Sequence, residues 1–325
     1  MKFKHAVVAT LGVCLGVAAS AACAQADYPN KPIRLLVGFA PGGTADVVAR
    51  IVAPKLSEQL NQQRIVIDNR AGAAQIVASE LTAKAAPDGY TLFMASAAFT
   101  INPALYKKLP FDALRDFSPI AIVAATPNVL LIHPAVPARS VKELIDLARA
   151  KPGQLLYGSG GVGTPSHLAG VLFNMLANTD ITHVSYKGSG AVMPDLLGGQ
   201  VQMAFPALSG VISQIKSGKL IALGVTSRQR SPSLRDVPTI EETGLAGYDA
   251  TSWFGLMAPA GILKALVARL NAVTNQVLKD AEVHEQLSRQ GAEPLGGLPE
   301  EFAAIISKDT ERWKKVVAIG GIKVE

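Results

Sequence analysis

Cysteine is almost absent from this chain: the only two in its 325 residues, Cys14 and Cys23, lie close to the N-terminus. The first 26 residues have the layout of a secretory signal peptide, with a basic start, an apolar run over residues 6–19 and small residues in Ala24-Gln25-Ala26. That apolar run is shorter than the ~20 residues needed to cross a bilayer. We expect residues 1–26 to be removed on export to the periplasm. The mature chain would then contain no cysteine, which excludes disulfides, a thiolate nucleophile and a thiolate metal site.

The mature chain also lacks the sequence motifs of most enzymes and of nucleic-acid-binding proteins. It contains no Gly-x-Ser-x-Gly elbow, no Walker A sequence and no His-x-x-x-His spacing. The 31 Lys and Arg residues outnumber the 25 Asp and Glu residues, which gives a net charge of +6, but they are scattered and are not interleaved with aromatic residues. We therefore expect no cofactor, no metal and no nucleic-acid partner.

One motif would fit a nucleotide cofactor: Gly158-x-Gly160-x-x-Gly163 matches the dinucleotide-binding fingerprint. That fingerprint also requires an acidic residue at the end of the following strand, where it binds the ribose. The following strand ends in Tyr186-Lys187, without an acid. We therefore reject a dehydrogenase. A secreted hydrolase of unfamiliar type, acting on a small carboxylate ester or amide, is the enzymatic alternative.

Short apolar runs alternate with amphipathic stretches, which predicts alternating strands and helices. In a first series we expect strands at 33–37, 64–68 and 91–95 and helices at 44–60 and 76–86. In a second series, after Pro127, we expect strands at 155–157, 181–185, 201–205 and 220–226 and helices at 165–176, 191–197 and 208–216. A capping box at Ser140-Val141-Lys142-Glu143 opens a further helix, and helices at 263–279, 281–290 and 299–317 form the tail. This order predicts an α/β fold with parallel sheets.

Two consecutive α/β series followed by a helical tail indicate two lobes. The tail needs a sheet to cover, and the first lobe is the better host for it. We therefore expect lobe 1 to comprise residues 27–126 plus 251–325, and lobe 2 to comprise residues 127–250. Two lobes that simply follow one another along the chain are the alternative, because hydrophobic periodicity does not distinguish the two arrangements.

The loops that follow the predicted strands are the candidate binding segments, because ligands of open parallel sheets lie beyond the carboxyl ends of the strands. Five such loops are rich in glycine, alanine and small hydroxyl residues. Their candidate ligand-binding residues are Phe39, Ala40, Pro41, Gly42, Gly43, Thr44 and Asp46; Gly72, Ala73, Ala74 and Gln75; Ser96 and Ala97; Ser159, Gly163, Thr164, Ser166 and His167; and Tyr186, Lys187 and Gly188. Lys187 would either add a point charge to the site or lie in a surface salt bridge.

Several of these loops open a helix, so their free backbone N–H groups would attract an anion. We expect Thr44 and Thr164 to cap their helices, with Pro165 at the first position of the second one. Asp46 fits a helix-stabilising carboxylate better than a ligand contact, and His167 fits a polar wall or a helix start better than a general base. Backbone N–H groups and small hydroxyls that converge from two lobes suit a carboxylate ligand.

A series of motifs in fixed order makes the chain resemble a known family. The motifs are Gly38-Phe39-x-Pro41-Gly42-Gly43-x-x-Asp46, Asn69-Arg70-x-Gly72-Ala73, Ala86-Pro87-Asp88-Gly89-Tyr90, Ile101-Asn102-Pro103, Gly163-Thr164-Pro165-Ser166-His167, Tyr186-Lys187-Gly188 and Asp236-Val237-Pro238-Thr239. They are similar to those of the periplasmic solute receptors of tripartite tricarboxylate transporters, the Bug receptors. The resemblance implies an α/β, two-lobe periplasmic-binding-protein fold (type II, Venus-flytrap) with a ligand cleft between the lobes. It also implies a carboxylate ligand that is delivered to membrane permease subunits by a receptor that acts, by default, as a monomer.

Three departures from the family pattern bear on the ligand. The loop after Asn69 usually reads Pro-Gly-Ala-Gly-Gly, whereas here it is Ala71-Gly72-Ala73-Ala74-Gln75. The stretch over 96–99 is less polar than usual, and Pro206 stands where many members carry an aspartate that can neutralise a ligand amine. We therefore include Pro206 among the site residues and expect a ligand with an apolar or aromatic body and one or two carboxylates, not a free α-amino acid.

Overall fold

A computed structural model describes residues 28–186 and 189–322. The predicted signal peptide over residues 1–26, with both cysteines, and the candidate site residues Lys187 and Gly188 lie outside the described residues. Within the described part of the chain, no helix is both long enough and apolar enough to cross a membrane.

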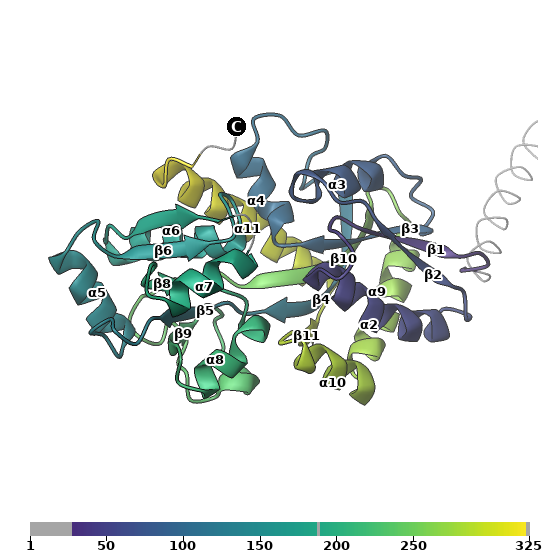
Figure 1. Ribbon diagram of the computed structural model, residues 1–325. Coiled ribbons are helices and arrows are strands. Elements are labelled where there is room, and N and C mark those ends of the chain that lie inside the picture. The colour runs from purple at the N-terminus through teal and green to yellow at the C-terminus, as the bar shows by residue number, and fades with distance from the viewer. Residues whose placement is uncertain (1–27, 187–188, 323–325) are drawn as a thin grey trace, which may run out of the picture.

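Two separate sheets organise the molecule, and Figure 1 shows them side by side. The first sheet has the order β11-β4-β10-β3-β1-β2, built from β1 (Ile33–Val37), β2 (Ile65–Asn69), β3 (Thr91–Ser96), β4 (Phe117–Thr126), β10 (Ser252–Pro259) and β11 (Glu293–Gly296). The second has the order β7-β6-β8-β5-β9, built from β5 (Val129–Ile132), β6 (Leu156–Ser159), β7 (Thr182–Ser185), β8 (Met203–Ala204) and β9 (Ile221–Val225). The chain passes from the first sheet to the second between β4 and β5, and β10 brings it back.

Helices cover both faces of the first sheet, because its strands are apolar on both sides. Along β1, Leu35 and Val37 face one core while Leu36 faces the other, as expected for side chains that alternate across a strand. On one face lie α2 (Thr44–Gln59), α9 (Lys264–Leu278) and α10 (Ala281–Arg289). On the other lie α3 (Ile76–Ala83), α4 (Ala98–Leu105) and α11 (Pro299–Ile319).

The second sheet is covered in the same way. The helices α5 (Val141–Ala150) and α6 (Pro165–Ala177) pack on one face, and α7 (Val192–Leu197) and α8 (Ile212–Lys216) pack on the other. Short 3-10 turns over Ala73–Gln75, Ser189–Ala191, Leu208–Gly210 and Pro232–Leu234 complete the described elements.

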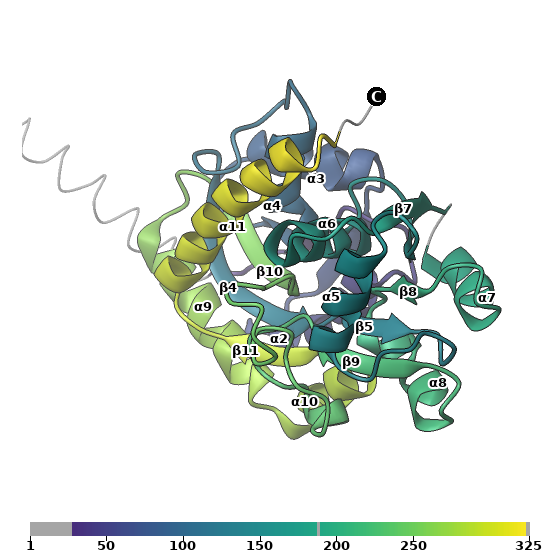
Figure 2. The ribbon, with the colours of Figure 1, turned by 90° about the vertical axis from the view of Figure 1, so that its left-hand side faces the viewer.

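The C-terminal helix α11 joins the two halves of the molecule. Its residues Phe302 and Ile306 belong to a core of the first sheet, whereas Trp313 and Val316 belong to a core of the second. Figure 2 shows α11 running across this face of the molecule. Movement of one sheet against the other must therefore change the packing of this helix.

The predicted strands and helices correspond to observed elements within a few residues at their ends, but five elements were missed. These are α4 and the strands β4, β5, β10 and β11. The expected parallel arrangement holds for β1, β2 and β3, but β10 is antiparallel to both of its neighbours, so the first sheet is mixed. The capping box is also only half formed, because the Glu143 carboxylate accepts from the Arg139 N–H and not from Ser140.

Candidate functional site

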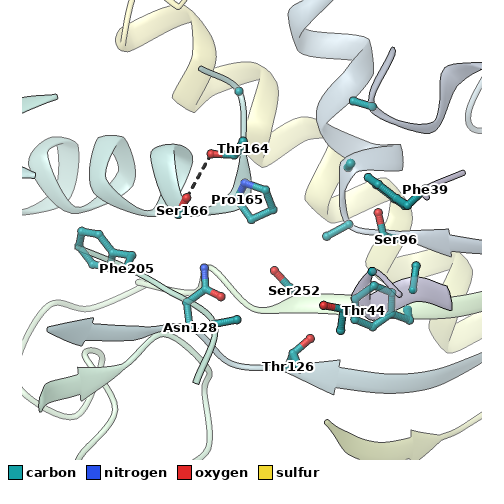
Figure 3. A pocket seen from close by; sticks show the side chains of 18 of the residues that line it. Phe39, Thr44, Ser96, Thr126, Asn128, Thr164, Pro165, Ser166, Phe205 and Ser252 are labelled. Carbon is teal, nitrogen blue, oxygen red and sulfur yellow. Dashed lines mark hydrogen bonds between the residues drawn. The ribbon is translucent and has the colours of Figure 1, made fainter. Parts of the chain in front are cut away.

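A cavity of about 400 Å³ is lined by strand residues of the first sheet, by loop residues that follow strands of both sheets, and by residues of α2, α4 and α6. Nine of its lining residues come from the predicted loops: Phe39, Gly43, Thr44, Ala74, Ser96, Ala97, Gly163, Thr164 and Ser166. Twelve others had not been singled out: Ala45, Ala98, Leu105, Tyr106, Thr126, Asn128, Val162, Pro165, Phe205, Ala207, Ser252 and Phe254. Figure 3 shows the start of α6 on one side of the cavity and the ends of β4 and β10 on the other.

The start of α2 forms part of the cavity wall and has no capping side chain. Gly43 is the N-cap residue, with φ −71° and ψ 161°, so Thr44 is the first helical residue and not the predicted cap. The first N–H that bonds into the helix is that of Val47, which donates to the Gly43 carbonyl at 2.9 Å. The N–H groups of Thr44 and Ala45 have no acceptor among the described residues. They can therefore bind an anion in the cavity.

Asp46 fixes the loop before α2 and does not reach the cavity. It is 1% exposed, and its Oδ2 accepts from the Gly42 N–H and from Arg50 Nε, both at 2.8 Å. Its Oδ1 accepts from Asn69 Nδ2 at 2.9 Å. Burial raises the pKa of this carboxyl, but hydrogen bonds from Arg50, Gly42 and Asn69 outweigh the burial and lower the pKa below its usual range. Asp46 therefore fixes the loop before α2, whereas its place in the sequence favoured a carboxylate that stabilises the helix over a ligand contact.

The start of α6 forms the opposite wall and is capped as predicted. The Thr164 hydroxyl accepts from the His167 N–H at 3.3 Å, and Pro165 occupies the first turn. The hydroxyls of Thr164 and Ser166 lie 3.1 Å apart at the cavity surface. Both hydroxyls are also bonded within this loop, because Thr164 Oγ1 donates to the Gly161 carbonyl at 2.7 Å and Ser166 Oγ accepts from the Gly160 N–H at 3.4 Å.

His167 supports this loop from behind. Its ring is 5% exposed and stacks on His183 with ring centroids 4.0 Å apart, and its Nδ1 accepts from the Gly163 N–H at 3.0 Å. Burial, with a smaller contribution from His183, lowers the pKa of His167 to about 4. A proton on Nδ1 would remove the acceptor that holds the Gly163 N–H, so the loop needs His167 to be neutral.

This shift predicts a specific acid sensitivity. Because the folded-state pKa lies below the unfolded value of about 6.5, the unfolded chain takes up the proton first, and stability present above pH 6.5 is lost as the pH falls toward 4. We expect His167 to account for about 2–3 kcal/mol of the loss between pH 7 and pH 4.5. Urea denaturation at both pH values should show a smaller loss for His167→Gln, which keeps an acceptor near Gly163. Equal losses in the two proteins would contradict this role.

The other predicted site residues lie outside the cavity wall. Ala40, Pro41, Gly42, Gly72 and Ala73 are exposed and do not line the cavity. Gln75 was a candidate ligand-binding residue, but it is fully buried and its amide exchanges hydrogen bonds with the backbone of Ser96. The Tyr186 hydroxyl donates to Asp195 Oδ2 at 2.7 Å. Ser159 and Pro206 line a separate cavity of about 10 Å³ that shares Ser166 with the large one.

No group of three or more potential ligands for a metal ion occurs among residues 28–186 and 189–322. No described residue that lines the large cavity carries a formal charge. The groups available to a ligand are therefore backbone N–H groups, hydroxyls, one amide and aromatic or aliphatic side chains. Such a site can bind and orient a molecule.

Comparisons with known proteins agree on one family. The model for "Tripartite tricarboxylate transporter family receptor" matches residues 48–322. Protein BugT of Bordetella pertussis is 35% identical over 322 residues, which cover 98% of this chain and 98% of BugT. Among solved structures, Rpa4515 of R. palustris with adipate is 35% identical, with a TM-score of 0.76 over 91% of this chain and 99% of that one. MatC of Rhodopseudomonas palustris with bound malate is 30% identical, with a TM-score of 0.72 over 89% of this chain and all of that one.

Proposed function

Because this chain belongs to the tripartite tricarboxylate transporter receptor family, we propose that it captures a small carboxylate in the large cavity and delivers it to a membrane permease of that transporter type. The family assignment confirms the resemblance found in the sequence motifs. The observation that carries the proposal is the uncapped start of α2, where Thr44 and Ala45 line the cavity and their N–H groups have no acceptor among the described residues. A carboxylate there gains charge-assisted hydrogen bonds and the favourable end of the helix dipole.

The proposal extends to how the receptor moves. We infer that residues 27–126 plus 251–325 form one lobe and residues 127–250 the other, and that the lobes close on the ligand. Closure would bring the start of α6 toward the start of α2, so that donors from both lobes contact the same molecule. The segments at β4–β5 and before β10, with α11, would serve as the hinge.

The compartment and the absence of catalysis are also part of this proposal. A signal peptide over residues 1–26 would place a monomeric receptor in the periplasm, where its permease partner is accessible. In this view the protein binds its ligand without changing it, since the described residues around the cavity supply neutral hydrogen-bonding groups and apolar contacts.

A thermal-shift screen of residues 27–325 tests the proposal. A ligand at about a hundred times its Kd stabilises the folded protein by roughly 2.7 kcal/mol, which should raise Tm by a few degrees in a chain of this size. We expect such a shift with at least one carboxylate, and none with the corresponding amide or with neutral sugars. A shift with sugars alone would contradict a carboxylate receptor.

A further inference from the structure

Three deeply buried polar side chains around the cavity have no hydrogen-bond partner among the residues that the structure describes. Thr126 is 2% exposed, Asn128 is 5% exposed and Ser96 is 8% exposed. Buried polar groups normally have a partner, because a buried group without one loses its interactions with water. All three line the cavity, and their polar atoms are not among the fully enclosed atoms without a partner, so a water or a ligand in the cavity can bond to them.

Asn128 is the most informative of these residues. Its backbone is fixed where the chain passes between the sheets, because its N–H donates to Thr226 Oγ1 at 2.9 Å and its carbonyl accepts from the Thr226 N–H at 2.9 Å. Figure 3 shows its amide directed toward the cavity beneath Pro165, with Thr126 and Ser252 beside it. An amide both donates and accepts, so it can bond to a hydroxyl or to a carbonyl, but it carries no charge.

Among the residues that the structure describes around the cavity, none carries a negative charge that could neutralise a ligand ammonium. The lining residues that the structure describes include no carboxylate. The buried Asp46 has both oxygens engaged by Gly42, Arg50 and Asn69, and Asp195 accepts from Tyr186. A ligand ammonium would therefore be buried against neutral groups, which is strongly unfavourable.

The remaining walls are apolar and come from several elements. Phe39 follows β1, Phe205 follows β8 and Phe254 lies in β10. Leu105 and Tyr106 at the end of α4 add a further side. Aromatic side chains of this kind stack on flat rings and exclude water from a bound apolar body.

We propose that the cavity selects a carboxylate whose apolar body contains a ring and which carries a neutral hydroxyl or carbonyl substituent near the carboxylate. In this proposal the Asn128 amide forms the hydrogen bond to that substituent. The inference rests on the proposed function, since it places the carboxylate at the start of α2. It adds that the part of the ligand away from the carboxylate is apolar and that the substituent carries no charge. Amino acids of the same shape are excluded by the lack of a counter-charge.

Isothermal titration of the mature protein with three acids of one skeleton tests this selection. The acids are phenylacetate, mandelate and phenylglycine, which differ only in bearing hydrogen, hydroxyl or ammonium next to the carboxylate. We expect mandelate to bind about 5- to 10-fold more tightly than phenylacetate, as one added hydrogen bond predicts, and at least ~100-fold more tightly than phenylglycine. Malate, which has the hydroxyl but no ring, should bind more weakly than mandelate.

Substitutions at position 128 assign the preference to this residue. Asn128→Asp supplies a carboxylate of the same shape, so phenylglycine should gain at least ~10-fold while mandelate weakens. Asn128→Ala removes the amide without breaking any bond within the described protein, and should bring mandelate and phenylacetate to nearly equal affinity. Asn30→Asp, an exposed site whose amide oxygen accepts from Tyr90, adds the same charge elsewhere and should change neither ratio.

The possible results of these titrations distinguish failure of this proposal from failure of the proposed function. Tighter binding of malate or phenylglycine than of mandelate by the natural protein would overturn the selection and leave a carboxylate receptor intact. Unchanged ratios in both Asn128 variants would overturn the role of Asn128. Failure of every carboxylate, in this panel and in the thermal-shift screen, would overturn the proposed function together with the selection.

Discussion

The Gly43→Val substitution should weaken carboxylate binding at least ~100-fold while the protein remains folded. Gly43 lines the cavity directly before the free N–H groups of Thr44 and Ala45. A branched side chain there would hold a carboxylate away from both donors, and each charge-assisted hydrogen bond contributes about 1.5–3 kcal/mol. The loss of two such bonds corresponds to a change of 100-fold or more in Kd. Calorimetric titration with whichever carboxylate gives a thermal shift measures this change.

The backbone at this position tolerates a side chain. The φ of Gly43 is −71°, and the nearest atom to an added Cβ is the Ala40 carbonyl oxygen at 3.3 Å. Gly198, at the end of α7, offers a matched control, because its φ is −84° and an added Cβ would lie 3.3 Å from the Pro194 carbonyl oxygen. Gly198→Val should therefore perturb the fold to a similar degree and leave binding unchanged. Full affinity in the Gly43 variant would remove the start of α2 from the binding site.

Local sequence signals were sufficient to predict much of the fold. The run over Ile33–Val37 is short, apolar and ended by a glycine, and it forms a strand as predicted. Thr164 and Pro165 begin α6 as their types predict, since the hydroxyl caps the helix and proline lacks only an N–H that has no partner there. Such features depend on residues close in sequence and are therefore readable without the structure.

The missed elements depend on contacts between distant residues. The alanine-rich run of β4 contains Pro119, which weakens a strand prediction, yet β4 pairs with β10 and β11 at the far end of the chain. In β10, Gly255 is required because a Cβ there would overlap the ring of Phe302 on α11. Neither requirement can be read from neighbouring residues.

The same limit explains which site residues were missed. Thr126, Asn128 and Ser252 lie at or near the ends of β4 and β10, which were not predicted, so no loop logic pointed to them. Four of the five predicted loops contribute residues to the cavity wall, but the side of each loop that faces inward is decided by bonds such as those of Asp46 and Gln75. The rule that ligands lie beyond the carboxyl ends of strands identifies candidate loops. It does not predict which side chains of those loops point into the cavity.

The Arg312→Met substitution should lower the free energy of unfolding by about 3–5 kcal/mol at neutral pH. Arg312 lies on α11 with its side chain 16% exposed, and it pairs with Asp249 at 3.3 Å and with Asp309 at 2.7 Å. Asp309 also accepts from Trp253 Nε1 at 3.0 Å. Methionine has similar length without the charge, so the variant leaves the buried carboxylate of Asp309 without its cation and the partly buried Asp249 with Arg228 alone. Breaking a buried ion pair in this way is strongly destabilising. Urea denaturation of the ligand-free protein measures the loss.

The pH dependence of this loss identifies its cause. Burial already raises the pKa of Asp309, whereas Arg312 and bonds from Thr251 and Arg228 hold the pKa of Asp249 low despite its burial. Without Arg312 both carboxyls should protonate more readily in the folded state, so the destabilisation should shrink as the pH falls from 8 to 5. Arg289→Met is the matched control, because Arg289 is 71% exposed beside Glu285 and such surface pairs contribute about 0–1 kcal/mol. A loss that is equally large at both pH values would mean that Arg312 acts through packing on Trp313 instead of through charge.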